Sequence, residues 1–119
     1  MMERLLPFAR LTQLLKVIEE LPVPMTSYNR HRMEYDYILG KLCLGIAKEK
    51  SFTISDFIHC EMLGSPPTAN KRIQELIQYQ LISVHQGDDR RERILMITDL
   101  GKDYLRICSE LMEKALVKT

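Results

Sequence analysis

The hydrophobic pattern of this chain changes between residues 81 and 98, and that change restricts the possible folds most. On both sides of the stretch, apolar residues recur at three- and four-residue steps, which predicts amphipathic helices. Within it, Leu81–His85 and Arg93–Thr98 are short, apolar runs separated by a polar segment around Gly87. Such a pair predicts two strands joined as a hairpin. The expected fold class is therefore mainly α with a small β-hairpin.

Two helices are expected ahead of residue 50. The first covers Glu3–Leu21 and ends at Pro22, because proline lacks an amide hydrogen and clashes with the preceding turn. Its apolar arc spans roughly 200°, about twice what a surface helix needs to face its own core. A second neighbour is therefore expected, either in another chain or inside a monomer. After a polar loop at residues 25–33, a second helix is expected over Tyr35–Lys48, with these side chains inward: Tyr35, Ile38, Leu39, Leu42, Cys43 and Ile46.

Two further helices form a predicted helix-turn-helix. Thr53 is the expected N-cap of a short helix that ends near Glu61. Ser65 is expected to cap the next helix, which has prolines in its first turn, where they are tolerated, and runs to about Tyr79. A tight turn containing Gly64 joins the two helices.

The last expected helix is Asp99–Val117, with these side chains inward: Leu100, Tyr104, Ile107, Cys108, Leu111, Met112 and Ala115.

The order of the expected elements indicates the domain organisation. A helix-turn-helix followed by a hairpin is the winged-helix arrangement. We therefore expect one winged-helix domain over residues 1–119, with a winged helix-turn-helix core at 53–101. The extra helices lie at 1–24, expected to mediate dimerisation, and at 99–117.

Composition and motifs argue against several function classes. Seventeen Lys and Arg against sixteen Asp and Glu leave a net charge of +1, so no general basic charge indicates a nucleic-acid partner. The three cysteines lie far apart without a Cys-x-x-Cys pair, and the three histidines lack metal-ligand spacing. No phosphate loop or nucleophile elbow is present. We expect no enzymatic activity, no metal and no cofactor.

The N-terminal apolar stretch does not predict a signal peptide, because Arg10, Lys16, Glu19 and Glu20 interrupt it. No apolar run approaches the roughly 20 residues that a membrane span needs. The expected location is the cytoplasm, without a membrane partner.

The predicted second helix of the helix-turn-helix has two contrasting faces. One is a narrow apolar stripe of Ala69, Ile73, Leu76 and Ile77. Opposite lies a face with one cation and no carboxylate, formed by Pro67, Asn70, Lys71, Gln74 and Gln78. Asn and Gln can contact adenine, and Lys can contact guanine or phosphate, so this face suits the major groove of DNA. An ordinary solvated helix face has a similar composition.

The predicted hairpin tip carries three arginines, Arg90, Arg91 and Arg93. Arginine suits phosphate or the minor groove, because its planar guanidinium is always charged and has many donors. A neighbouring aspartate could hold an arginine in one rotamer through a bidentate pair. A solvated charged turn is the alternative.

These motifs give Thr53–Gly101 a resemblance to the DNA-binding core of MarR-type winged-helix regulators. The wing of that family has Asp-x-Arg, a strand ending in an apolar residue and Thr, and Gly at the start of the last helix. Here these positions are Asp89–Arg91, Ile97-Thr98 and Gly101. The family's Ser-x-x-Thr-Val-Ser-Arg recognition helix is matched by Ser65, Thr68, Ala69, Asn70 and Lys71.

The resemblance implies double-stranded DNA as partner and a homodimer formed through the N- and C-terminal helices. Arg91 would be the wing arginine in the minor groove, and Asp89 would be its orienting partner. Asn70 and Lys71 would read the major groove, and Thr68 would contact the backbone or a base edge.

The chain also departs from the family. Leu81-Ile82 matches the family's apolar pair, but Gln80 stands where the family has glycine. We therefore expect the recognition helix to end without a left-handed cap. Only 18 residues follow Gly101, fewer than in the family, and the broad apolar arc of the first helix could compensate in a dimer.

The thiols are candidates for oxidant sensing, as in some MarR-like proteins. A sensor thiol is exposed and lies beside a cation or a helix start. Cys43 and Cys108 lie on apolar helical faces and are expected to be inert, whereas the sequence leaves the role of Cys60 open.

A tyrosine-rich segment is a candidate pocket for a small aromatic ligand. It comprises Tyr28, Tyr35 and Tyr37 near Arg30 and Arg32. Tyrosines that bridge the core and water explain the same pattern.

Two functions follow from these residues. The first is a dimeric winged-helix transcriptional regulator that contacts DNA through Ser65, Pro67, Thr68, Asn70, Lys71, Gln74, Arg90, Arg91 and Arg93. The alternative is a winged-helix protein-interaction module that joins an assembly through its apolar terminal helices and does not bind DNA. Near-neutral charge favours the alternative, and the Asp89-x-Arg91 wing favours DNA.

Overall fold

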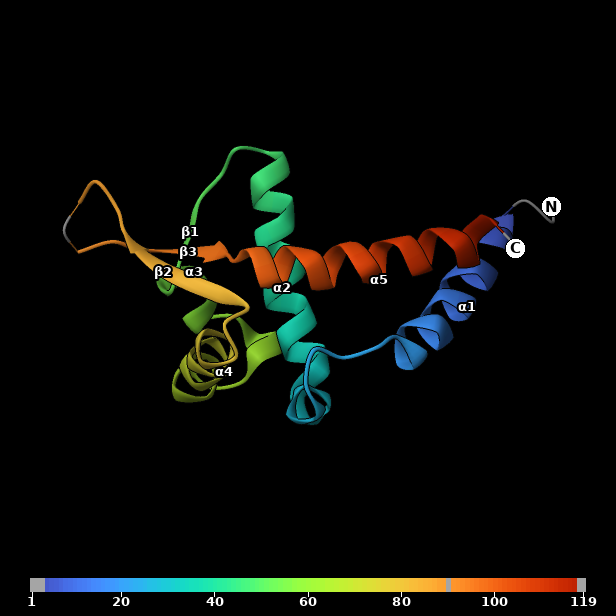
Figure 1. Ribbon diagram of the computed structural model, residues 1–119, viewed down its shortest axis with the longest axis horizontal. Coiled ribbons are helices and arrows are strands. Elements are labelled where there is room, and N and C mark those ends of the chain that lie inside the picture. The colour runs from blue at the N-terminus through green and yellow to red at the C-terminus, as the bar shows by residue number, and fades with distance from the viewer. Residues whose placement is uncertain (1–3, 90, 118–119) are drawn as a thin grey trace. The chain divides into compact units, whose positions relative to one another are not determined.

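The computed structural model describes residues 4–89 and 91–117, and Figure 1 shows helices together with one small antiparallel sheet. This confirms the predicted fold class, mainly α with a small β part. Arg90, a predicted site residue, lies outside the described residues. The described chain forms two compact units. Unit 1 holds the residues up to Pro24 and from Asp103, and unit 2 is Met25–Lys102, which contains the predicted 53–101 core.

Unit 1 consists of α1 (Leu6–Glu20) and most of α5 (Asp99–Val117). The amide of Leu21 bonds to the carbonyl of Ile18, and α1 ends just before Pro22 as predicted. No residue of α1 is buried. In α5 the predicted bounds are confirmed, but the predicted burial is wrong at three exposed positions, Leu100, Ile107 and Leu111. Helical periodicity identifies an apolar face, but it does not determine whether other side chains of the protein bury that face.

Unit 2 begins with a 3-10 helix, η2 (Thr26–His31), followed directly by α2 (Arg32–Ala47). The predicted loop at residues 25–33 is therefore wrong for most of its length. Tyr28 explains the difference, because it is fully buried and its hydroxyl donates to the carboxylate of Asp36 at 2.5 Å. The rings of Tyr28 and Tyr35 lie 4.9 Å apart, and Tyr35 is also fully buried. These two rings fill the core, so they do not line an open pocket for an aromatic ligand.

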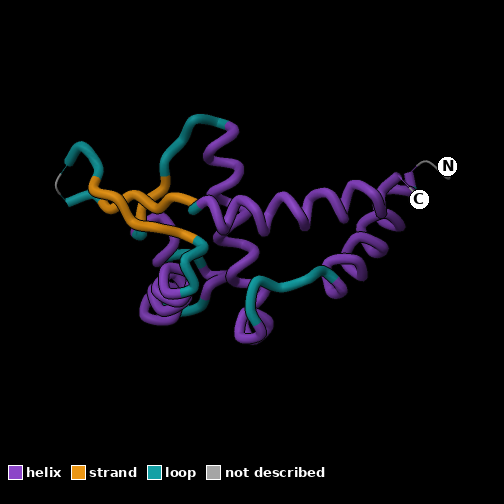
Figure 2. The backbone as a smooth tube through the Cα atoms, in the orientation of Figure 1, coloured by secondary structure: helices purple, strands orange, loops and turns teal. Residues whose placement is uncertain are grey.

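The sheet has the order β1-β3-β2, with antiparallel pairs throughout. The predicted hairpin is formed by β2 (Ile82–Gln86) and β3 (Arg93–Ile97), which Figure 2 shows extending from the helices. The strand β1 (Phe52–Thr53) was not predicted, because two residues are too few to show alternation. Thr53 therefore lies in a strand, and the N-cap of α3 (Ser55–Ile58) is Ile54.

The short α3 ends at Ile58 rather than near Glu61. A separate 3-10 turn, η3 (Glu61–Leu63), and Gly64 then lead into α4 (Pro66–Gln78). Gly64 has a φ of 88°, a left-handed conformation that favours glycine, so it makes the tight turn predicted for the helix-turn-helix. The element order from α2 to β3 is that of a winged helix-turn-helix.

Both long helices of unit 2 end in the same cap, in which a non-glycine residue adopts the left-handed conformation. Gln80 has a φ of 62°, and the amides of Gln80 and Leu81 bond to the carbonyls of Ile77 and Leu76. This is the Schellman motif. The expectation that α4 ends without a left-handed cap is therefore wrong: glutamine takes the conformation that glycine usually takes. Glu49, with a φ of 55°, ends α2 in the same way.

The Thr-x-x-Gly sequence at the start of α5 has a structural role. The Thr98 hydroxyl donates to the carbonyl of Gln80 at 2.6 Å and accepts from the amide of Gly101 at 3.0 Å. A Cβ on Gly101 would lie 2.3 Å from the carbonyl oxygen of Leu81. Residues 98–101 therefore fasten the start of α5 to the end of α4, and the close approach requires glycine.

Candidate nucleic-acid interface

The helix α4 is held from one side by its own unit. Ala69, Ile73 and Leu76 are buried, as the predicted apolar stripe requires, whereas Ile77 is half-buried. Ser65 caps the helix as predicted, since its Oγ accepts from the amide of Thr68 at 3.4 Å.

The opposite face of α4 is open to solvent. Pro67, Asn70, Lys71 and Gln74 are exposed, together with Gln78, so the structure brings these predicted contact residues onto one surface. Thr68 is half-buried, and its hydroxyl lies 3.0 Å from that of Ser65 within the cap.

Arg72 does not belong to this open face. Its guanidinium pairs with the carboxylate of Glu75, and the two side chains are only 12% and 23% exposed. The charge that a DNA phosphate would meet on α4 is therefore that of Lys71. The pair also removes the carboxylate of Glu75 from the open face, because its charge is neutralised at the side of the helix.

Glu75 belongs to a network that ties α4 to α2. Burial alone would raise the pKa of Glu75, but the guanidinium of Arg72 and the hydroxyl of Tyr35 together lower it below its usual value. Burial raises the pKa of Tyr35 most, and the neighbouring Tyr79 and the charge of Glu75 raise it further. The rings of Tyr35 and Tyr79 meet edge to face with centroids 5.8 Å apart. These contacts fix the orientation of α4 relative to the core of unit 2.

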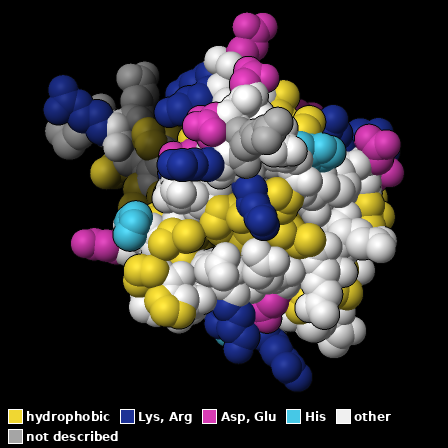
Figure 3. Space-filling view, turned by 90° about the vertical axis from the view of Figure 1, so that its left-hand side faces the viewer, with side chains coloured by type: hydrophobic (Ala, Val, Ile, Leu, Met, Phe, Trp, Pro, Cys, Tyr) yellow, Lys and Arg dark blue, Asp and Glu magenta, His cyan; other side chains and the backbone are white. Residues whose placement is uncertain are grey.

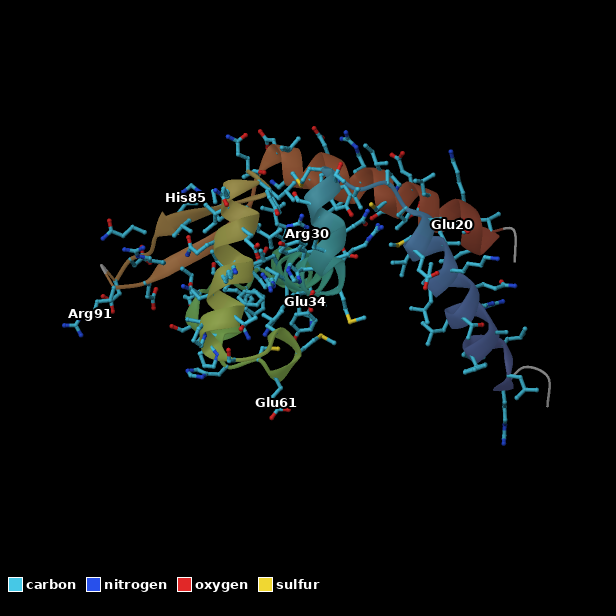
Figure 4. The ribbon with its side chains drawn as sticks, turned by 90° about the horizontal axis from the view of Figure 1, so that it is seen from below. Glu20, Arg30, Glu34, Glu61, His85 and Arg91 are labelled. Carbon is cyan, nitrogen blue, oxygen red and sulfur yellow. The ribbon has the colours of Figure 1, made fainter. Side chains whose placement is uncertain are left out.

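The hairpin presents its arginines to solvent. Arg91 and Arg93 are exposed, and Figure 4 shows Arg91 at the far end of the hairpin, pointing outward. Among the described residues, the ion pairs present involve neither of these two arginines.

Asp89 acts on the main chain of this turn. Its carboxylate accepts a hydrogen bond from the amide of Arg91 at 3.1 Å. The amide of Glu92 bonds to the carbonyl of Asp89 at 2.9 Å, and Gly87 bonds to Glu92 at 3.0 Å. Asp89 thus shapes the loop that carries Arg91, which is a way to orient the arginine without binding its guanidinium.

Charges of both signs are interspersed around the hairpin end of the molecule. Figure 3 shows basic side chains next to acidic ones and apolar patches, without one continuous basic surface. This arrangement agrees with the net charge of +1.

The three thiols differ in environment. Cys108 is buried, and burial raises the pKa of the half-buried Cys43. The thiol of Cys60 donates to the hydroxyl of Tyr37 at 3.5 Å. Hydrogen bonding to Tyr37 lowers the pKa of Cys60 most, although partial burial opposes it, and nearby backbone amides and Lys41 add to the lowering.

Comparisons with known proteins do not place this chain. No protein-family model matches the sequence, and no curated protein resembles it closely enough to count as a relative. The MarR-type resemblance thus stays a prediction carried by the motifs between Thr53 and Gly101. Within residues 4–89 and 91–117, no helix has the length and apolar character needed to cross a membrane. In the same ranges, no three His, Cys, Asp or Glu side chains gather to hold a metal ion.

Proposed function

We propose that this protein is a MarR-like, winged-helix transcriptional regulator that binds double-stranded DNA as a homodimer. In the proposed complex, α4 lies in the major groove, and Arg91 reaches the adjacent minor groove. The observation that carries this proposal is the open face of α4. It has amides at Asn70 and Gln74, a cation at Lys71 and no carboxylate, and it lies on a helix whose other face is fixed in the core.

The rigidity of α4 supports a role in reading DNA. A helix contributes specificity only if its side chains hold their position relative to the groove, and here the cap, the buried stripe and the contact between the Tyr35 and Tyr79 rings fix it. Asn and Gln can each make two hydrogen bonds to adenine in the major groove. The proposed half-site is therefore expected to contain A·T pairs opposite Asn70 and Gln74.

The exposed apolar face of α1 supports the homodimer. Phe8 is 73% exposed, Leu6, Leu11 and Leu15 are exposed along the same helix, and Leu5 is exposed just before it. An isolated helix of about 15 residues is marginal in water, so α1 needs an apolar surface to pack against. A second α1 supplies such a surface by symmetry, because a two-fold interface uses the same patch on both subunits.

The experiment that tests DNA binding is a salt titration of binding to mixed genomic fragments. Binding should weaken steeply with salt, because phosphate contacts release counterions. Arg91→Ala should weaken binding roughly tenfold and make the salt dependence shallower. The hydrogen bond from Asp89 goes to the backbone of Arg91, so this substitution leaves the turn intact.

The matched control is Arg106→Ala, which removes an exposed arginine from α5 outside the proposed interface. This variant should bind DNA as the wild type does. If the protein fails to bind any DNA even at low salt, the regulator proposal is wrong. The alternative of a protein-interaction module would then be favoured, because its surface, the apolar face of α1, does not depend on DNA.

The experiment that tests the homodimer is light scattering after gel filtration. The wild type should elute with twice the mass of one chain, and Phe8→Glu should elute as a monomer, because it places a charge in the interface. A wild-type monomer at every concentration would contradict the proposed dimer. With a dimer, the two recognition helices should lie about 34 Å apart, one turn of DNA, and the binding site should be nearly palindromic.

A further inference from the structure

Unit 2 contains a groove that the proposed DNA contacts do not use. It has a volume of about 590 Å³ and lies between the last turns of α2, the segment that leads into β1, and the strands β2 and β3. No residue of α4 lines it. A pocket of roughly 300–1,000 Å³ has the size of a small-molecule site.

The floor of the groove is apolar. Leu42, Phe52 and Leu95 are buried there, while Ile46 and Met96 line the groove with 58% and 50% of their surface exposed. The prediction that Ile46 points into the core is therefore wrong. Exposed large apolar side chains around a groove indicate a binding site for an apolar group. Binding there is favourable because it removes apolar surface from water.

Gly45 shapes this floor. A Cβ at this position would lie 2.6 Å from the ring of Phe52 and 2.7 Å from the carbonyl oxygen of Lys50. Glycine therefore lets the chain fold back tightly after α2, and the left-handed turn at Glu49 completes the reversal. Lys50 and Ser51 form one wall of the groove as a result.

The charged groups that line the groove are mostly basic. They are the ammonium groups of Lys50 and Lys102 and the carboxylate of Glu49, and the imidazole of His85 also lines the groove. The ammonium of Lys50 lies 5.2 Å from the centroid of the Phe52 ring, so it stands directly over the apolar floor. Among the described residues, neither lysine has a carboxylate within ion-pair distance. The Nε2 atom of His85 lies 2.9 Å from the hydroxyl of Ser83.

We propose that this groove binds a small organic carboxylate with an aliphatic body. The aliphatic chain would lie against Leu42, Ile46 and Met96, and the carboxylate would meet the ammonium groups of Lys50 and Lys102. An inorganic anion would leave the apolar floor in water, and a neutral or cationic amphiphile would leave both lysines without a carboxylate partner. An amphiphilic anion satisfies both parts, and this site does not depend on DNA binding.

The experiment is a titration of the full-length, isotope-labelled protein with octanoate, followed by amide NMR in the absence of DNA. Octanoate should shift the amides of residues 45–52, 85–86 and 94–97 saturably, with a Kd of roughly 0.1–1 mM, typical of a ligand with so few atoms. Octanol and octylammonium carry the same chain without the negative charge. Each should bind at least about fivefold more weakly, because the lysines then contribute nothing or repel.

Variants separate the charge from the apolar floor. The double substitution Lys50→Gln and Lys102→Gln should weaken octanoate binding about tenfold and leave octanol binding unchanged. Met96→Trp should weaken both, because a larger side chain at this exposed position fills the groove. Lys48→Gln is the matched control, since Lys48 is an exposed lysine next in the chain to Glu49 and does not line the groove.

The proposal is overturned if octanol or octylammonium binds as tightly as octanoate. It is equally overturned if octanoate binds without saturation, or shifts amides outside the three stretches instead of those within them. Each variant's amide spectrum reports its fold directly. Because the titration contains no DNA, its failure is distinct from a failure of the proposed regulator function.

Discussion

The helices α1 and α4 have similar lengths but opposite surroundings. In α4, three apolar side chains are buried and the exposed face is polar. In α1, no side chain is buried, and the exposed side chains include a phenylalanine and three leucines. One helix is stabilised by its own chain, and the other exposes the kind of surface that normally forms a core.

This difference shows what an apolar stripe does and does not determine. The stripe on α4 predicts burial correctly because Ala69, Ile73 and Leu76 face elements of the same unit. The stripe on α1 has the same period, yet none of its side chains is buried. A 15-residue helix gains little from propensity alone, so α1 should depend on protein concentration in a way that α4 does not.

The largest expected effect comes from truncating one buried side chain in α4. Ile73→Ala removes a fully buried side chain and leaves a cavity, so it should lower the free energy of unfolding by about 2–5 kcal/mol. The loss should be the same at all protein concentrations. Leu11→Ala, on the exposed face of α1, should be nearly neutral at low concentration and destabilising at high concentration. Urea unfolding at several protein concentrations measures both.

Equal effects of the two substitutions at every concentration would contradict this comparison. In that case α1 would be covered by its own chain, and the second copy would not be needed. A concentration dependence of Ile73→Ala beyond that of the wild type would mean that α4 itself contributes to the association.

A smaller loss is expected where α4 meets α5. Gly101→Ala places a Cβ against the carbonyl oxygen of Leu81, at 2.3 Å before any adjustment, so the backbone must move. The expected loss is about 1–3 kcal/mol, the usual range for overpacking. Lys102→Ala, at the next and exposed position of α5, is the matched control and should change thermal stability little. If Gly101→Ala is as stable as the wild type, the contact is not tight in solution.

The sequence predicts the helices whose apolar residues recur at a regular spacing over several turns. It does not predict elements whose formation depends on a single contact. The bounds of α5 and the cap at Ser65 follow from pattern and residue type. The 3-10 turn around Tyr28 was not predicted, because it depends on a hydrogen bond from the Tyr28 hydroxyl to Asp36 in the following helix. The strand β1 was missed for the same reason, since two residues become a strand only by pairing with β3.

The candidate interface likewise has features that follow from helical spacing and features that depend on individual contacts. The open face of α4 follows from helical spacing, so its exposed residues could be predicted by counting. Two local contacts were not predicted: Arg72 pairs with Glu75 rather than facing solvent, and Asp89 binds an amide rather than a guanidinium. The groove was also missed, because its lining comes from separate segments that only the fold brings together.

An effect of about 0.5–1 kcal/mol is expected from the Arg72–Glu75 pair, the upper part of the range for exposed ion pairs, because this pair is partly buried. The pKa of Glu75 is lower in the folded protein than in the unfolded chain. Its stabilisation is therefore complete above the unfolded pKa, near 4.3, and is lost as the pH falls through the folded value. Glu75→Gln should lower stability at pH 7 and flatten the acid side of the stability curve below about pH 5. Denaturant unfolding from pH 7 to pH 3 measures this.

The matched control is Asp103→Asn, which breaks an exposed pair with Arg106 on α5. This change should leave both the stability at pH 7 and its pH dependence as in the wild type. An acid limb in Glu75→Gln as steep as in the wild type would mean that other carboxylates determine it.

The smallest expected effect is a gain in stability at the end of α4. Gln80 holds a left-handed backbone at a φ of 62°, which costs an L-residue about 1–2 kcal/mol. Glycine removes that cost but loses more conformational entropy on folding, by about 0.5–1 kcal/mol. Gln80→Gly should therefore raise the free energy of unfolding by roughly 0.5 kcal/mol, seen as a higher urea midpoint at unchanged slope.

The same cap at Glu49, at the end of α2, provides a second test of this prediction. Glu49→Gly should give a gain of similar size, since α2 ends in the same hydrogen-bonding pattern with a φ of 55°. A loss at either position would mean that the side chain makes a contact worth more than the strain of its backbone. Equal gains at both would mean that the left-handed backbone is strained in each cap and that neither side chain makes a contact that offsets the strain.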